Sequence, residues 1–153
     1  MTIRMLWGWI MMLTLVQCGA PDQERASADA AVLKDVTVAE FEALIQSLDA
    51  PLLLDVRSPE EWAEGHLKGA SHKDYWGDDG FDGCMQRIPK GRPVLVYCAG
   101  GGRSGLTANE LHAMGHQEVY NLKGGITGWQ EEGRQVVQGP AVAFEEAKGV
   151  DPL

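Results

Sequence analysis

Residues 94–104 read VLVYCAGGGRS: an apolar run, a cysteine, three glycines, an arginine and a serine. The run at 94–97 has the length and continuous apolarity of a strand that is covered on both faces of a sheet. After the glycines, Leu106, Leu111 and Met114 mark a helix. The stretch therefore predicts a strand, a glycine-rich turn and a helix in succession.

The rest of the chain repeats this alternation. Thr37 with Glu40, and Ser58 with Glu61, form capping boxes that predict the starts of two helices. The expected elements, in order, are a helix at 38–48, a strand at 52–54, a short helix from 59, a short strand at 69–71, a loop with one helix within 74–93, a strand at 118–122 and a short helix with Trp129. Strands alternating with helices predict an α/β fold: a parallel sheet with helices on both faces.

The composition indicates one globular domain and excludes some partners. The chain has 153 residues, of which 44% are hydrophobic and 23% are charged, too few for two large cores. Its 22 acidic and 13 basic residues give a net charge of -9. Since binding to a nucleic acid backbone needs a basic face, we expect no nucleic acid partner.

The N-terminus has the layout of a secretory signal. Arg4 precedes an apolar run at 5–16, which is shorter than the roughly 20 residues that span a bilayer. The sequence LVQC at 15–18 resembles the bacterial lipobox, although Gln17 departs from its usual small residue, and it predicts lipidation of Cys18. A permanent N-terminal anchor and cleavage after Ala20 are the alternatives.

These features divide the chain into four parts. We expect a signal peptide at 1–17, a lipidated flexible tether at 18–31, a folded domain at 32–138 and an acidic, loosely packed tail at 139–153. The expected location is the bacterial cell envelope, facing the periplasm, with membrane contact through lipid. Cleavage after Ala20 would instead give a soluble periplasmic protein.

Cys98 is the candidate nucleophile, because it stands between a strand and a helix N-terminus. Unpaired N–H groups and the helix dipole stabilise an anion at this position. A free cysteine, with a pKa near 8.5, is only about 3% thiolate at pH 7, so a lowered pKa would activate it. The glycines let N–H groups turn inward, and Arg103 adds a cation at the rim. The alternative is a small buried side chain that merely ends a strand.

The other cysteines suggest no metal site. Cys18, Cys84 and Cys98 lack the spacing of zinc ligands, and their odd number argues against a disulfide framework. Cys84 is either a relay thiol for Cys98 or an unpaired loop cysteine.

Over residues 34–137 the chain resembles the single-domain rhodaneses, a family of sulfurtransferases. The resemblance rests on three motifs: LDVR with EEW and GHLKGA within 54–70, the loop at 98–104, and YNLKGGI with a tryptophan within 120–129. Only four residues separate Cys98 from Arg103, whereas the phosphatase loop has five. The shorter loop suits a terminal sulfur better than a phosphate.

The resemblance implies sulfur transfer through a persulfide on Cys98, from thiosulfate or another persulfide donor to a thiol or cyanide, with no metal or organic cofactor. The substrate-binding residues implied are Ala99, Gly100, Gly101, Gly102, Arg103 and Ser104. A cysteine-dependent phosphatase or arsenate reductase, and a non-catalytic persulfide carrier, are the rival functions.

Several residues outside the loop receive supporting roles from the same resemblance. Asp55 and Arg57 are expected to stabilise the active loop, with Arg57 paired to Glu61; the alternative is a purely structural ion pair. His66 is expected to be structural, with a general base as the alternative, and Trp76 either lines the pocket mouth or is an ordinary exposed aromatic.

The loop also departs from many thiosulfate-using members, because residues 99–102 carry no basic or hydrogen-bonding side chain. Thiosulfate would then be recognised mainly by the backbone, which leaves room for a different persulfide as the physiological donor.

Overall fold

The computed structural model describes residues 31–77 and 80–144. The expected signal peptide at 1–17, the lipidation site Cys18, the tether up to residue 30 and the tail from residue 145 lie outside the described residues.

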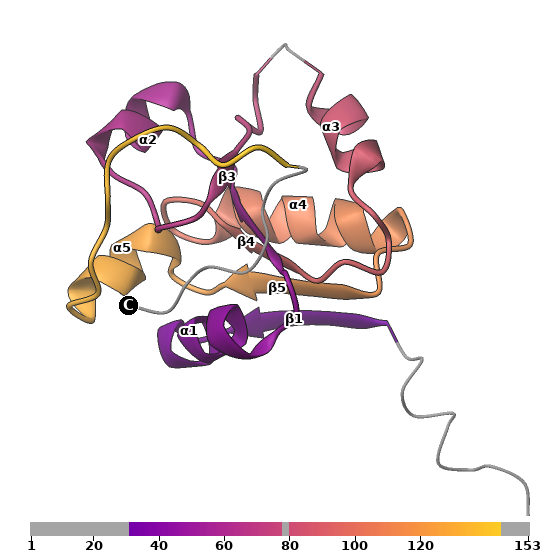
Figure 1. The fold of residues 1–153 in the computed structure, drawn as a ribbon, viewed down its shortest axis with the longest axis horizontal. Coiled ribbons are helices and arrows are strands. Elements are labelled where there is room, and N and C mark those ends of the chain that lie inside the picture. The colour runs from indigo at the N-terminus through magenta and orange to yellow at the C-terminus, as the bar shows by residue number, and fades with distance from the viewer. Residues whose placement is uncertain (1–30, 78–79, 145–153) are drawn as a thin grey trace, which may run out of the picture.

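The described chain forms a five-stranded sheet in the order β1-β5-β4-β2-β3, in which every pairing is parallel (Figure 1). The strands are β1 (Val32–Val36), β2 (Leu52–Asp55), β3 (Ser71–His72), β4 (Val94–Tyr97) and β5 (Glu118–Leu122). The helices are α1 (Val38–Ser47), α2 (Pro59–Glu64), α3 (Phe81–Arg87), α4 (Gly102–Ala113) and α5 (Gly125–Glu131). The expected parallel α/β fold is confirmed.

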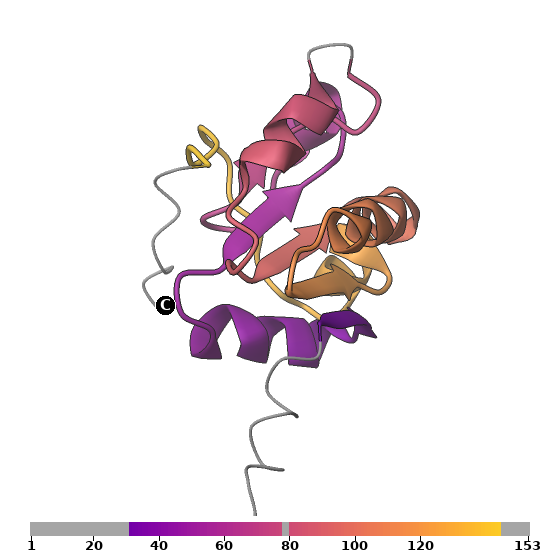
Figure 2. The same ribbon diagram turned by 90° about the vertical axis from the view of Figure 1, so that its right-hand side faces the viewer.

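Two buried clusters cover the two faces of the sheet. Leu54 on β2 and Val96 on β4 face the cluster that contains α3 and α4 residues, whereas their neighbours Leu53 and Leu95 face the cluster with α1 and α5 residues. This alternation follows from the period of two along a strand. Figure 2 shows α1 and α4 on opposite sides of the sheet. Helices therefore cover both faces, as the apolar runs predicted.

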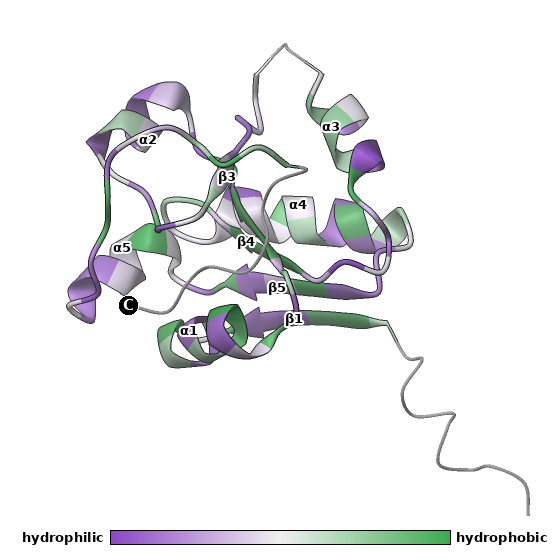
Figure 3. Cartoon of the chain, viewed as in Figure 1, coloured by the Kyte–Doolittle hydropathy of each residue, from purple (hydrophilic) through white to green (hydrophobic). Residues whose placement is uncertain are grey.

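Both expected capping boxes are present. The Thr37 side chain accepts from the Glu40 N–H while Glu40 accepts from the Thr37 N–H, and Ser58 and Glu61 do the same at the start of α2, with Pro59 as its first residue. Figure 3 shows hydrophobic and hydrophilic residues on different sides of α1, which is typical of a helix packed on a sheet.

Three local features differ from expectation. The strand β1 was not expected; only Val36 of its residues is buried, because β1 lies at the sheet edge. The short strand near 69–71 instead occupies 71–72. Leu106, expected on the packed face of α4, is 54% exposed.

Part of the expected C-terminal tail lies within the described residues. Val142 and Phe144 are partly buried against the α3 and α4 cluster, whereas residues 139–141 and 143 are exposed. The Val142 N–H donates to Ala70 O at 3.0 Å, and Arg92 donates to Phe144 O at 2.7 Å. Two apolar side chains of the tail therefore contact the domain.

Candidate active site

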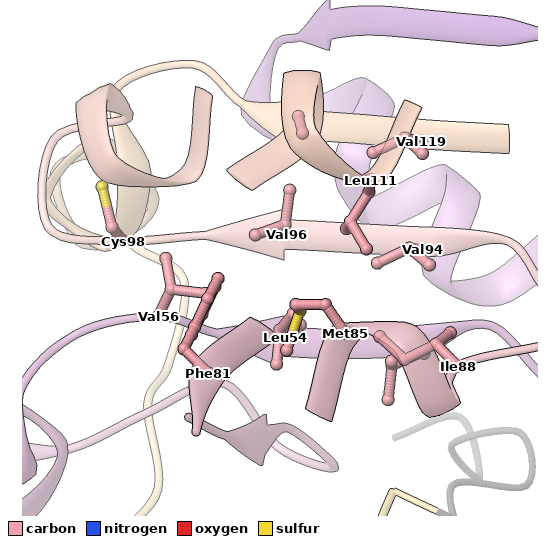
Figure 4. Close-up of a cluster of buried hydrophobic side chains, with 12 residues drawn as sticks. Leu54, Val56, Phe81, Met85, Ile88, Val94, Val96, Cys98, Leu111 and Val119 are labelled. Atoms are coloured by element: carbon pink, nitrogen blue, oxygen red, sulfur yellow. The ribbon is translucent and has the colours of Figure 1, made fainter. Parts of the chain in front are cut away.

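Cys98 follows β4 directly, at the carboxyl ends of the strands, where ligands of open parallel sheets commonly bind. It is only 2% exposed. Figure 4 shows Cys98 at one end of the buried cluster, beyond the arrowhead of β4, with its sulfur pointing away from Val56 and Phe81. The strand therefore places the sulfur between the sheet and the start of α4.

Hydrogen-bond donors surround the Cys98 sulfur. The Gly101 N–H donates to Sγ at 3.1 Å and the Ser104 hydroxyl at 3.4 Å. Burial raises the pKa of the Cys98 thiol, but hydrogen bonds from the Ser104 side chain and from the N–H groups of Ser104, Gly101 and Gly100 outweigh this effect. The pKa of Cys98 is consequently lowered from its usual value, as an activated nucleophile requires.

Of the three loop glycines, only Gly101 is required by the geometry. Its φ is 95°, and a Cβ there would lie 3.2 Å from both Gly124 N and Leu122 O. A Cβ at Gly100 or Gly102 would meet no atom within 4 Å. The space around Gly100 and Gly102 would therefore accept a Cβ, whereas that around Gly101 would not.

The start of α5 holds the outer side of the loop. The Ile126 N–H donates to Cys98 O at 2.9 Å, and the Thr127 N–H donates to Ala99 O at 3.1 Å. Gly125 has a φ of 58°, and a Cβ there would collide with both of these carbonyl groups. The two bonds fix the loop carbonyls toward α5, which leaves loop N–H groups free to face the sulfur.

Asn121 on β5 adds a second support that the sequence alone did not assign. Its side-chain amide is 5% exposed and donates to Gly101 O at 3.3 Å and to Asp35 Oδ1 at 2.8 Å. Asn121 and Gly125 both lie in the third sequence motif, but only the fold brings that motif against the loop.

Arg103 is held by an acidic partner at the mouth of the site. Its two terminal nitrogens donate to the two carboxylate oxygens of Glu61 at 2.7 and 2.6 Å. The hydrogen bond from Arg103 lowers the pKa of Glu61 to about 2, against the opposing effect of burial. The Trp76 ring lies 5.0 Å from the Arg103 guanidinium carbon and is 70% exposed. Trp76 therefore borders the site, as one of its two expected roles requires.

The expected pairing of Arg57 with the Glu61 side chain is wrong. Arg57 pairs with Asp55 through three side-chain hydrogen bonds of 2.7 to 3.0 Å, and both residues are buried. Arg57 reaches Glu61 only through its backbone carbonyl, at 3.0 Å, and also donates to Gly65 O at 2.7 Å. The pair therefore anchors α2 to β2, and the Arg57 guanidinium also lies 5.9 Å from the ring centre of Tyr97, the residue before Cys98.

The remaining candidate residues from the sequence are His66 and Cys84. His66 stacks on Trp62 with ring centroids 3.6 Å apart, and its ring nitrogens contact the carbonyls of Leu67 and Gly139. These contacts are structural. Cys84 lies on α3, not in a loop, and its sulfur accepts from Arg87 at 3.0 Å.

Residues 31–77 and 80–144 contain neither a cluster of metal-binding side chains nor a membrane-spanning helix. No group of three or more His, Cys, Asp or Glu side chains is placed to hold a metal ion there. No helix in the same ranges is long and apolar enough to cross a membrane.

Comparison with known proteins places this site in a family. Residues 37–132 match the model of the rhodanese-like domain. The thiosulfate sulfurtransferase GlpE of Tolumonas auensis is 35% identical over 95 residues, which are 62% of this chain and 86% of that protein.

Solved structures agree with this match. The crystal structure of a rhodanese-like domain protein from Staphylococcus aureus has a TM-score of 0.59 at 26% identity, over 70% of this chain and 99% of that one. The polysulfide-sulfur transferase homodimer of Wolinella succinogenes has a TM-score of 0.58 at 26% identity, over 76% of this chain and 84% of that one. The chain belongs to the rhodanese-like domain family, and its relatives include sulfurtransferases.

Proposed function

We propose that the protein moves a sulfane sulfur from thiosulfate or another sulfane donor to a thiol or cyanide through a persulfide on Cys98. The observation that carries the proposal is the geometry around the buried Cys98 sulfur, which accepts hydrogen bonds from the Gly101 N–H at 3.1 Å and from the Ser104 hydroxyl at 3.4 Å. These donors lower the pKa of the thiol. The names of its relatives support the same class of reaction.

The reaction has two half-reactions that share this site. In the first, the Cys98 thiolate attacks the outer sulfur of thiosulfate; a new S–S bond forms, the donor S–S bond breaks, and sulfite leaves with the electron pair. The terminal persulfide sulfur is then anionic, and inward N–H groups stabilise it as they stabilise the thiolate. In the second, cyanide or a thiolate attacks that sulfur and regenerates the Cys98 thiolate.

The test combines intact mass with turnover. Treatment with thiosulfate should add one sulfur atom to the protein, and Cys98→Ser should lose this adduct. Titration with cyanide should then release thiocyanate over many turnovers. An adduct without turnover would support the persulfide carrier, whereas release of phosphate from an aryl phosphate, dependent on Cys98, would support the phosphatase.

The contact between Arg103 and Glu61 argues against the phosphatase. In that chemistry the guanidinium must bind phosphate oxygens, but here both of its terminal nitrogens donate to a carboxylate. Four residues between Cys98 and Arg103 also make a smaller loop than the phosphatase loop.

We also propose that the protein is exported and held in the bacterial cell envelope by lipid on Cys18. The support is the sequence alone: a short apolar run at 5–16 followed by the lipobox-like residues 15–18. Labelling of cells with palmitate should mark the full chain and fail for Cys18→Ser. Export without label would favour the soluble periplasmic form.

A further inference from the structure

The charge at the mouth of the site is set by an ion pair between residues far apart in the sequence. Glu61 lies on α2 and Arg103 on α4, and both Arg103 terminal nitrogens contact the Glu61 carboxylate. The Glu61 side chain remains 31% exposed, whereas that of Arg103 is 13% exposed. An approaching donor therefore meets the carboxylate as well as the cation.

No side chain of the loop other than Arg103 offsets the negative charge of Glu61. Residues 98–104 contain no cationic side chain besides Arg103. Within this loop, a donor anion would be bound by N–H groups and by an Arg103 guanidinium that is already paired with Glu61, in a protein whose net charge is -9. The repulsion between Glu61 and a donor grows with the negative charge of that donor.

Trp76 presents the opposite chemistry at the same mouth. Its ring lies over Arg103 and is 70% exposed. An aromatic face contacts an organic substituent more favourably than it contacts a sulfonate oxygen. The mouth thus combines an acidic group with an apolar one.

We propose that Glu61 is a specificity-determining residue that makes the site favour monoanionic organic donors, such as thiosulfonates and organic persulfides, over the thiosulfate dianion. This inference rests on the proposed function and defines its donor class.

Two donors of nearly equal size test the inference. Thiosulfate is a dianion, and methanethiosulfonate is a monoanion in which a methyl group replaces one oxygen. Attack by Cys98 on the outer sulfur of either donor forms the same persulfide and releases sulfite or methanesulfinate, respectively. In a two-step exchange, the kcat/KM for the donor reports only this half-reaction.

The variant is Glu61→Gln, and the matched control is Glu60→Gln. Glutamine keeps an oxygen for the capping box of α2 while it removes the charge. Glu60 is the adjacent exposed acid, and its carboxylate accepts from the Ser58 hydroxyl at 2.7 Å. The control therefore removes the same charge one residue away from the ion pair.

At low ionic strength, Glu61→Gln should raise kcat/KM for thiosulfate about tenfold and for methanethiosulfonate only about threefold, because the dianion carries twice the charge. The ratio between the donors should therefore shift about threefold, and added salt should reduce this shift. Glu60→Gln should leave the ratio within about 1.5-fold of the original.

Three results would overturn the inference: an unchanged donor ratio in Glu61→Gln, an equal shift in both variants, or an equal loss with both donors. The last would mean that Glu61 only positions Arg103. Failure of the proposed function looks different, because the unmodified protein would then form no persulfide and show no turnover with either donor.

Discussion

Cys98 and Cys84 are both free thiols packed against the same buried cluster, yet their surroundings differ. Cys98 follows a strand and receives hydrogen bonds from the loop and from Ser104. Cys84 lies within the short helix α3, where its own N–H donates to Gly80 O at 3.1 Å and its sulfur accepts from the exposed Arg87 at 3.0 Å. This difference predicts that Cys98, whose sulfur accepts from the backbone, is the reactive thiol of the two.

The largest expected effect separates the two thiols directly. Cys98→Ser should lower sulfurtransferase turnover about a thousandfold or more, because a serine hydroxyl cannot form the persulfide. Cys84→Ser should stay within about twofold of the original rate. The rate of thiocyanate release measures the turnover of both variants. A loss of tenfold or more in Cys84→Ser would instead establish it as a relay thiol.

Replacing a glycine near each of the two cysteines by alanine should change the free energy of unfolding in opposite directions. Gly125→Ala forces a Cβ into the carbonyls of Cys98 and Ala99 at a positive φ, so it should destabilise the fold by about 3 kcal/mol or more. In Gly83→Ala on α3, the added Cβ would meet no atom within 4 Å. This substitution should therefore stabilise the fold by about 0.5 to 1 kcal/mol.

Urea unfolding of these two variants and the original chain provides the measurement. Equal stability of Gly125→Ala and the original chain would show that α5 does not fix the loop as described.

The next effect concerns ionisation of Cys98. In a background with both Cys18→Ser and Cys84→Ser, alkylation of Cys98 by iodoacetamide should rise with pH and reach half its maximum below the usual pKa of a free cysteine, since the thiolate is the reacting form. Ser104→Ala removes one donor to the thiolate, so the pKa of Cys98 should move upward.

The midpoint of the alkylation rate against pH is the readout. A midpoint in Ser104→Ala at or below that of the background would contradict the role given to this hydroxyl.

The smallest effect should come from the cation beside Cys84. Arg87 is exposed and donates to the sulfur of Cys84, a thiol that the proposed reaction does not use, so Arg87→Ala should change donor kcat/KM by less than about twofold. A large loss of kcat/KM in Arg87→Ala would mean that this cation contributes to the reaction, contrary to the difference inferred between Cys84 and Cys98.

Most of the fold could be predicted from local sequence patterns. The apolar runs at 52–54 and 94–97 and the segment 118–122 became strands, and both capping boxes formed, because each signal lies within a few neighbouring residues. The edge strand β1 left no such signal, since its middle three residues are exposed and do not form an apolar run.

The site was less predictable, because its decisive contacts join residues far apart in the chain. Cys98 and its loop could be singled out from one segment, but Glu61 could be paired with Arg103 only once α2 and α4 were placed. The same holds for Gly125, whose contact with the loop depends on the order of β4 and β5 in the sheet.

The open space beside Gly100 and Gly102 has an evolutionary consequence. Substitutions at these two positions could give related proteins new substrate preferences while Gly101 and the backbone around the sulfur stay unchanged. Substrate selectivity and the reactivity of Cys98 thus depend on different positions of this loop. Substitutions can change the selectivity without lowering the reactivity.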